Sequence, residues 1–174
     1  MEHIEQQVSL QNAIQNLPGC LCWSFVGGEG TGSTFSIEIG KKIPRSRPSK
    51  NKFLSDDAKL YDGEYSLYVQ FASWRLDDSQ SVICTSTDSN HNDGLMVKGL
   101  SRLVGCVISN VLLTKPGYDL VLDFDRGYRL TVFCCWSNEL EPATNYDFFT
   151  PDQVFSIESR SEIKIAPRNS GRPD

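Results

Sequence analysis

The positions of apolar residues along this chain follow, over most of its length, the period of two that is typical of β-strands. The segment 64–76 shows this most clearly, because Tyr65, Leu67, Val69 and Phe71 occupy every second position. The same pattern, bounded by turn-forming residues, predicts about eight strands. They cover residues 20–26, 34–39, 64–76, 81–86, 106–114, 118–124, 128–136 and 154–166.

Three segments have helical features instead. Residues 4–17 predict an amphipathic helix that Pro18 and Gly19 end. Ser55 has the position of an N-cap for a short helix that begins at Asp56 and Asp57. The apolar stripe of the first helix is Ile4, Val8, Ala13, Ile14 and Leu17, and a third helix at 95–103 is expected to turn Met96, Leu100 and Leu103 inward.

A turn at residues 125–127 fixes the register of the hairpin that it connects. On one side of this hairpin every expected cross-strand pair is apolar. The other side pairs Asp123 with Arg129 as a cross-strand ion pair. The apolar pairs are Leu120 with Val132, Leu122 with Leu130 and Phe124 with Tyr128, and Val121 faces Thr131 on the polar side.

The overall pattern, in which short turns join consecutive strands, indicates an antiparallel sheet. We therefore expect a mainly β fold (β-rich α+β), in which about eight strands coil into a sandwich or partial barrel. A short N-terminal helix packs on this sheet. The length of 174 residues suits a single domain at 1–166, followed by a disordered C-terminal tail at 167–174.

The composition is that of a globular protein, with 39% hydrophobic residues, 22% charged residues and a mean hydropathy of −0.32. No apolar run approaches the roughly 20 residues that cross a bilayer, and the N-terminus has no secretory pattern. We therefore expect a cytoplasmic protein that makes no membrane contact.

The six cysteines are expected to be reduced thiols, because Cys84, Cys106 and Cys134 fall within strand-like runs. The chain contains no CxxC pair, and only His3 and His91 could complete a metal site. The sequence therefore predicts neither a metal nor another cofactor.

Three polar segments resemble catalytic or binding motifs but lack an essential part of each. The glycine-rich segment 27–33 leads into a strand and carries no lysine, so a hairpin tip suits it better than a phosphate loop. Residues 88–94 lack the glycine and glutamate of a calcium loop. Asp119, Asp123 and Asp125 share a strand face, but Arg129 is placed to neutralise Asp123. With only two histidines, no catalytic residue is assigned.

The segment 41–52 contains six positive charges in a protein whose net charge is −5. A solvated loop and a protein contact both fit this segment, whereas nucleic-acid binding does not suit a pI near 5.1. The basic residues are Lys41, Lys42, Arg45, Arg47, Lys50 and Lys52.

Two aromatic segments supply candidate partner-binding residues, and for the second a role as a cover of the core stays open beside a role in an interface. The first contains Trp74 and Arg75, and the second is expected to be a loop. The candidate residues in the second are Asn145, Tyr146, Phe148 and Phe149.

The chain resembles a group of small uncharacterised bacterial proteins over roughly residues 18–165. The residues that carry the resemblance are Gly63-Glu64-Tyr65-Ser66-Leu67, Trp74-Arg75-Leu76, Leu103-Val104-Gly105, Asp119-Leu120-Val121-Leu122-Asp123-Phe124 and Asn145-Tyr146-Asp147-Phe148-Phe149-Thr150-Pro151. This resemblance implies an architecture and a bacterial origin but no activity. In size, acidity and strand content the chain is also similar to immunity proteins of bacterial toxin systems, although it shares no motif with them.

These observations favour a non-catalytic protein-binding module of the bacterial cytosol, of an immunity-like or defence-associated kind. The alternative is a β-barrel that binds or turns over a small phosphate- or carboxylate-bearing molecule, and a deep pocket lined by Arg75, Arg102 or Arg129 together with acids would favour it. Association of two copies through an edge strand is compatible with both hypotheses.

Overall fold

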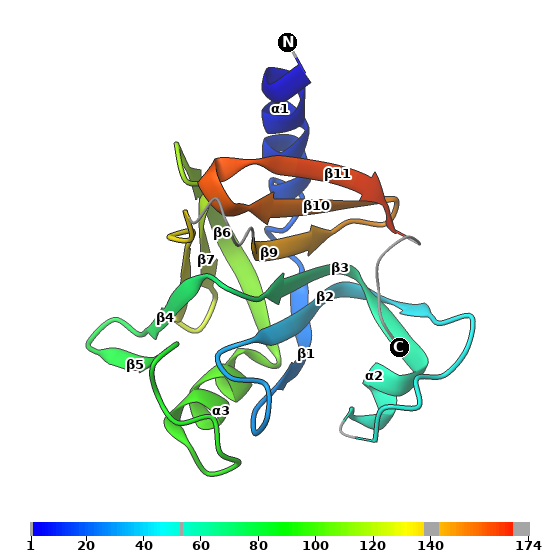
Figure 1. Ribbon diagram of the computed structural model, residues 1–174. Helices are drawn as coiled ribbons and strands as arrows, with labels where there is room; N and C mark the ends of the chain where they lie inside the picture. Colours follow the sequence, from blue (N-terminus) through cyan, green and yellow to red (C-terminus); the bar gives the residue numbers. More distant parts are fainter. Residues whose placement is uncertain (1, 53, 138–142, 169–174) are drawn as a thin grey trace.

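The structure is a computed structural model that describes residues 2–52, 54–137 and 143–168 (Figure 1). Within these residues eleven strands form one antiparallel sheet in the order β11-β10-β9-β3-β2-β1-β6-β7-β8-β4-β5. The strands are β1 (Leu21–Gly27), β2 (Phe35–Pro44), β3 (Tyr61–Val69), β4 (Ser73–Asp77), β5 (Val82–Thr85), β6 (Cys106–Thr114), β7 (Asp119–Phe124), β8 (Arg129–Phe133), β9 (Thr144–Phe149), β10 (Gln153–Glu158) and β11 (Ile163–Pro167).

The β-rich antiparallel architecture with an N-terminal helix is confirmed, but the expected strand count and closure were wrong. The predicted strand at 64–76 is interrupted after Val69, so that β3 and β4 lie in different parts of the sheet. The predicted strand at 154–166 folds back as the hairpin β10–β11, and the expected aromatic loop is strand β9. The sheet is open, because β11 and β5 lie at opposite ends of the strand order.

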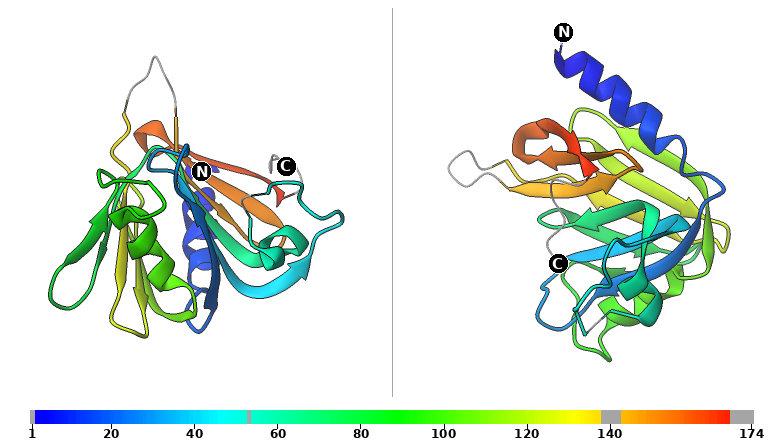
Figure 2. Two further views of the ribbon diagram at one scale, coloured as in Figure 1. Left: turned by 90° about the horizontal axis from the view of Figure 1, so that it is seen from below. Right: turned by 90° about the vertical axis from the view of Figure 1, so that its right-hand side faces the viewer.

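The sheet bends so that its two halves share one core. Seen from below, the two halves diverge like the arms of a V (Figure 2). Phe35 of β2 packs edge-on against Trp74 of β4, with ring centroids 5.1 Å apart. Because β2 and β4 belong to different halves of the strand order, this contact connects the two arms. Burial of such large aromatic side chains supplies much of the driving force for folding.

The helix α1 (Glu2–Ile14) contacts β11 and buries only the C-terminal part of the stripe that we predicted. Leu10 and Ile14 are fully buried, whereas Ile4 and Val8 are 64% and 55% exposed. The prediction was correct for Ile14 and Leu17, which are buried, and wrong for Ile4 and Val8, because the first turns of the helix extend beyond the sheet (Figure 1). None of the described helices is long and apolar enough to cross a membrane.

Two short helices agree with their sequence signals. In α2 (Asp56–Leu60) the Ser55 hydroxyl caps the first turn by accepting a hydrogen bond of 3.2 Å from the Ala58 amide. The helix α3 (Leu95–Leu100) continues into the 3-10 turn η1 (Ser101–Leu103). The buried residues of this unit include the predicted Met96, Leu100 and Leu103.

The register of the β7–β8 hairpin is the one that the sequence predicts. Leu120 pairs with Val132, and Asp123 pairs with Arg129. The amide of Phe124 donates to the carbonyl of Tyr128 at 2.9 Å. Local turn geometry and alternation therefore sufficed to place these side chains.

The predicted tail at 167–174 begins too early. Pro167 is the last residue of β11, and the guanidinium of Arg168 donates to the carbonyls of Gly63 at 2.6 Å and Thr150 at 2.8 Å. These bonds connect the C-terminal segment to β3, so the ordered fold includes Arg168. Residues 169–174 lie outside the described part of the chain.

Candidate functional site

The outward surface of β4, β8, β7 and β6 carries a row of polar side chains that crosses all four strands. The strand registers place Asp77 beside Arg129, Arg129 beside Asp123, and Asp123 beside Asn110. Alternate residues of the same strands, such as Leu76, point into the core. We call Asp77, Arg129, Asp123 and Asn110 the charged row.

The centre of the charged row is an ion pair with two hydrogen bonds. Arg129 donates through Nε to Asp123 at 2.6 Å and through Nη2 at 3.2 Å, and Asn110 donates to the same carboxylate at 3.1 Å. The hydrogen bond from Arg129 is the main reason that the pKa of Asp123 is lowered, and the pKa of Arg129 is correspondingly raised. Both side chains therefore stay charged.

Arg75 lies next to the charged row and is fixed by two neighbours. Its Nε donates to Asp77 at 2.9 Å, and its guanidinium lies 6.0 Å from the ring centroid of Phe133. The side chain nevertheless remains 46% exposed. Arg75 is the one predicted aromatic-segment residue that the structure places on the surface.

An open cleft of about 820 Å³ lies between the β4–β5 turn and the β7–β8 turn. Arg75 and Arg129 line it together with acidic residues, and Arg102 does not, but the cleft is open whereas the ligand-binding hypothesis called for a deep pocket. Asp78 shapes one wall, because its carboxylate accepts hydrogen bonds from the amides of Gln80 and Ser81, each at 2.8 Å. These bonds lower the pKa of Asp78.

Aromatic side chains border the charged row on the side of Phe133. Phe71 follows the end of β3, is 56% exposed and lies 5.7 Å from Trp136 between ring centroids. Neither Phe71 nor Trp136 lines the cleft. We use the term outer face for the surface formed by the charged row, Arg75, Phe71, Phe133 and Trp136.

Trp74, the neighbour of Arg75 in sequence, belongs to the core. Its side chain is 1% exposed, and its Nε1 donates to the carbonyl of Ser33 at 2.8 Å. Burial with a satisfied N–H is the usual structural role of tryptophan. The prediction of a surface position for Trp74 is therefore wrong.

The four candidates at 145–149 are also buried, with exposed fractions from 0% to 4%. The ring of Phe148 stacks parallel to that of Tyr65 at 6.0 Å. Asn145 donates to the carbonyl of Glu158 at 3.2 Å. Of the two interpretations left open, the structure matches the core one for Asn145, Tyr146, Phe148 and Phe149.

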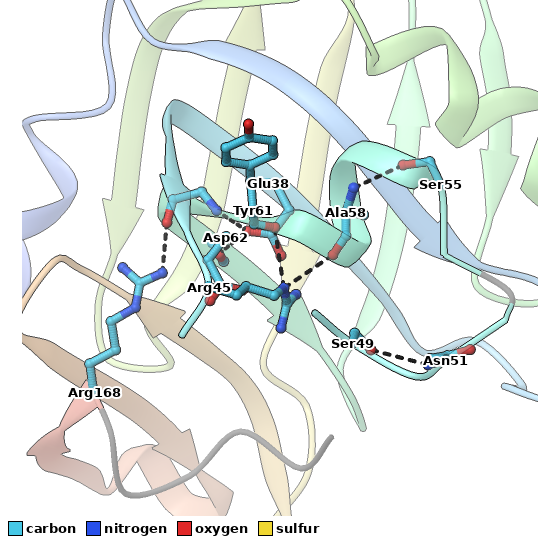
Figure 3. Close-up of polar contacts among 11 residues, drawn as sticks. Glu38, Arg45, Ser49, Asn51, Ser55, Ala58, Tyr61, Asp62 and Arg168 are labelled. Atoms are coloured by element: carbon cyan, nitrogen blue, oxygen red, sulfur yellow. Dashed lines mark hydrogen bonds and ion pairs between the residues drawn. The ribbon is translucent and has the colours of Figure 1, made fainter. Parts of the chain in front are cut away.

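The basic segment is partly folded against α2 rather than being a free loop. Residues up to Pro44 belong to β2. Arg45 donates from Nε to the Ala58 carbonyl at 3.1 Å and pairs with Asp62 at 2.8 Å (Figure 3). Lys42 lies 2.6 Å from Asp57 and 5.2 Å from the ring centroid of Trp23. The other predicted cations, Lys41, Arg47, Lys50 and Lys52, are exposed and line neither described cleft.

A buried carboxylate that sequence reasoning missed lies beside this segment. Glu38 is 5% exposed and accepts hydrogen bonds from the Gly63 amide at 2.6 Å and from the Ser66 hydroxyl. A Cβ at Gly63 would lie 2.8 Å from the Glu38 carboxylate. The glycine directly before the predicted strand at 64–76 was therefore the available signal of a close approach.

The other motifs that the sequence raised have structural explanations. The glycine-rich tip is held by Asn90, which donates to the carbonyls of Gly28 at 3.0 Å and Gly32 at 3.1 Å. All six cysteines are free thiols, of which Cys22, Cys84 and Cys106 are buried. Across residues 2–52, 54–137 and 143–168, no three His, Cys, Asp or Glu side chains form a group that could bind a metal ion.

Comparison with known protein families, with curated proteins and with solved structures gave no match. The outer face and the two pockets are therefore the features from which a function can be inferred.

Proposed function

We propose that this chain is a non-catalytic protein-binding module and that its outer face contacts the partner. The observation that supports this most strongly is the position of Arg75, which is fixed by Asp77 and Phe133 yet remains about half exposed. Arginine and aromatic residues dominate the energetics of protein interfaces. A side chain that is already oriented loses less entropy when it binds.

The partner should present carboxylate or carbonyl oxygens to Arg75. Arg75 uses Nε for Asp77, and among the described residues its two Nη groups have no protein acceptor. A guanidinium can form two parallel hydrogen bonds to a carboxylate. Phe71 supplies an exposed apolar contact on the same surface.

The electrostatics of the cleft favour binding over proton transfer. Hydrogen bonds lower the pKa values of Asp78 and Asp123, whereas a carboxyl that acts as a general acid needs a raised pKa. Asp77 is paired with Arg75. Asp77 and Asp123 are therefore paired with arginines, and Asp78 is held by backbone amides.

Affinity purification from the native host with the Arg75→Gln variant tests this proposal. The wild-type chain should retain one stoichiometric partner, and Arg75→Gln should lose it. Arg47→Gln is the matched control, since Arg47 is exposed and belongs to the segment between β2 and α2, which contributes no residue to the outer face. Equal recovery of the partner by both variants would contradict the proposal.

The likeness to immunity proteins leads to a narrower proposal. In this narrower proposal the partner is a bacterial toxin. Coexpression of the wild-type chain with that toxin should then protect cells. Arg75→Gln should abolish the protection without reducing the amount of folded protein, and Arg47→Gln should leave it intact.

The volume of the cleft and its two guanidinium groups favour a second candidate, a small oxyanion-bearing molecule bound between Arg75 and Arg129. Phe71→Ser separates the two candidates, because Phe71 lies on the outer face but outside the cleft. This change should weaken protein binding and leave small-molecule binding, measured by calorimetry, unchanged.

A further inference from the structure

A second cavity, of about 520 Å³, lies on another part of the molecule. Its lining residues come from α1, from the turn between β6 and β7, and from the turn between β10 and β11. Its lining includes Gln7, Lys115, Tyr118, Arg160, Ser161 and Glu162. No residue of the outer face belongs to it, so it is independent of the proposed partner surface.

The cavity brings together every non-glycine residue with positive φ in the described part of the chain. Tyr118, Arg160 and Ser161 have φ values of 62°, 62° and 64°. Glycine and asparagine adopt this left-handed conformation at lower cost. Unfavourable backbone conformations of this kind concentrate at ligand-binding sites.

The fold explains the conformation of Tyr118 but not the choice of residues at 160 and 161. The Tyr118 carbonyl accepts a hydrogen bond from the buried Tyr146 hydroxyl, which requires the turn to be in this position. Arg160 is exposed and Ser161 is half-buried at a hairpin turn, where Asn and Gly would fit with less strain. These two residues thus place a cationic and a hydroxyl side chain at the cavity from a strained backbone.

The charges of the cavity favour an anion. Lys115 and Arg160 contribute two cations, and Glu162 contributes one carboxylate. The Lys115 ammonium donates to Gln7 Oε1 at 3.0 Å, and among the described residues no carboxylate lies within ion-pair distance of it. An ammonium has three donors, so Lys115 can still donate to a ligand.

We propose that this cavity binds a small molecule through an oxyanion, either a carboxylate or a phosphate. Lys115 and Arg160 would contact the negatively charged oxygens, and the Ser161 hydroxyl would donate a further hydrogen bond. Gln7 of α1 orients the ammonium of Lys115, so that the N-terminal helix forms part of the site.

Titration calorimetry with inorganic phosphate and with acetate, at constant ionic strength adjusted with sodium chloride, tests the proposal. Wild type should bind at least one of the two anions saturably, and the preferred anion identifies the chemical source. Lys115→Gln should weaken that binding by about tenfold or more, since a charge-assisted hydrogen bond is lost. Lys98→Gln, which removes an exposed charge on α3, should leave it unchanged. No saturable binding, or equal loss in both variants, would overturn the proposal.

The double variant Arg160→Asn/Ser161→Gly separates a binding role from a structural one. It should raise the thermal midpoint of the ligand-free protein, because asparagine and glycine both adopt positive φ with little strain. It should also weaken anion binding. Unchanged anion affinity in this variant would show that the two side chains do not contact the ligand. Arg75→Gln should leave anion binding intact, so the test does not depend on the partner surface.

Discussion

The hydroxyl of Tyr146 on β9 donates a hydrogen bond of 3.0 Å to the backbone carbonyl of Tyr118. Tyr118 precedes β7 and has a φ of 62°. The bond therefore links the two halves of the sheet and holds the β6–β7 turn in a conformation that tyrosine seldom adopts. Burial raises the pKa of Tyr146 well above its usual value, so the hydroxyl remains a donor.

Tyr146→Phe should lower the free energy of unfolding by about 1–2 kcal/mol, because the buried hydrogen bond to Tyr118 is lost. Chemical denaturation of wild type and variant measures this change. Tyr128→Phe is the control, since Tyr128 is partly exposed and packs at the edge of the core. An equal effect of the two changes would show that the link between the halves contributes no stability.

Asp123→Asn should cost about 0.5–1 kcal/mol at pH 7, because the Arg129 side chain is 58% exposed and solvent weakens the pair. The folded pKa of Asp123 lies below its unfolded value. The pair therefore stabilises the protein above the unfolded pKa, and this contribution is lost as the pH falls through the folded pKa. Denaturation between pH 2 and about 7 should show a shallower acid limb for the variant, and identical limbs would contradict this role.

Asp147→Asn should stabilise the protein at pH 7, whereas Asp123→Asn should destabilise it. Burial raises the pKa of Asp147 despite hydrogen bonds from Ser156 at 2.5 Å and Gln70 at 2.8 Å. Ionisation of Asp147 therefore removes stability as the pH rises from the unfolded pKa through the folded pKa. An asparagine can bond to both partners without a charge, so the variant should have the higher thermal midpoint at pH 7 and lose this advantage in acid. A lower midpoint at pH 7 would contradict the prediction.

Glu38→Ala should lower the free energy of unfolding by about 2–4 kcal/mol, since the change leaves the Gly63 amide and the Ser66 hydroxyl buried without this acceptor and opens a cavity. Glu29→Ala, at the exposed hairpin tip, should have an effect close to zero. Urea denaturation with both variants gives the comparison. A small effect at Glu38 would mean that water replaces the carboxylate.

Cys135 should react first when the native protein is treated with iodoacetamide at pH 8. Its thiol is exposed and lies 3.4 Å from the Ser73 hydroxyl, and hydrogen bonds with Ser73 lower its pKa. Burial raises the pKa of Cys22 to about 12 and that of Cys84 to about 11. Mass spectrometry of partly labelled protein should show this order, and Ser73→Ala should slow labelling of Cys135. Labelling of Cys22 before Cys135 would contradict this prediction.

Sequence reasoning succeeded where the interacting residues are close along the chain. The Asp123–Arg129 pair was predicted because one short turn sets both residues opposite each other. The inward positions of Met96 and Leu100 followed from helical spacing alone. These features depend on local geometry, which the order of residues specifies.

The candidate binding residues were harder to assign, because burial depends on distant segments. Phe148 and Asn145 looked like loop residues, since β9 has both faces covered and therefore lacks a period of two. The strand is formed through pairing with β3 at Leu67, far earlier in the chain. The surface position of Arg75 likewise became clear only once β4 was placed beside β8.

The sequence by itself determined a β-rich chain, the β7–β8 hairpin and the short helices, because alternation and capping act over a few residues. Only the tertiary structure decided that the sheet is open, that Glu38 is buried beside Gly63, and that Lys115 and Arg160 line one cavity. These outcomes depend on which strands pair and on how their side chains fill the space between them, and local periodicity carries no information about either.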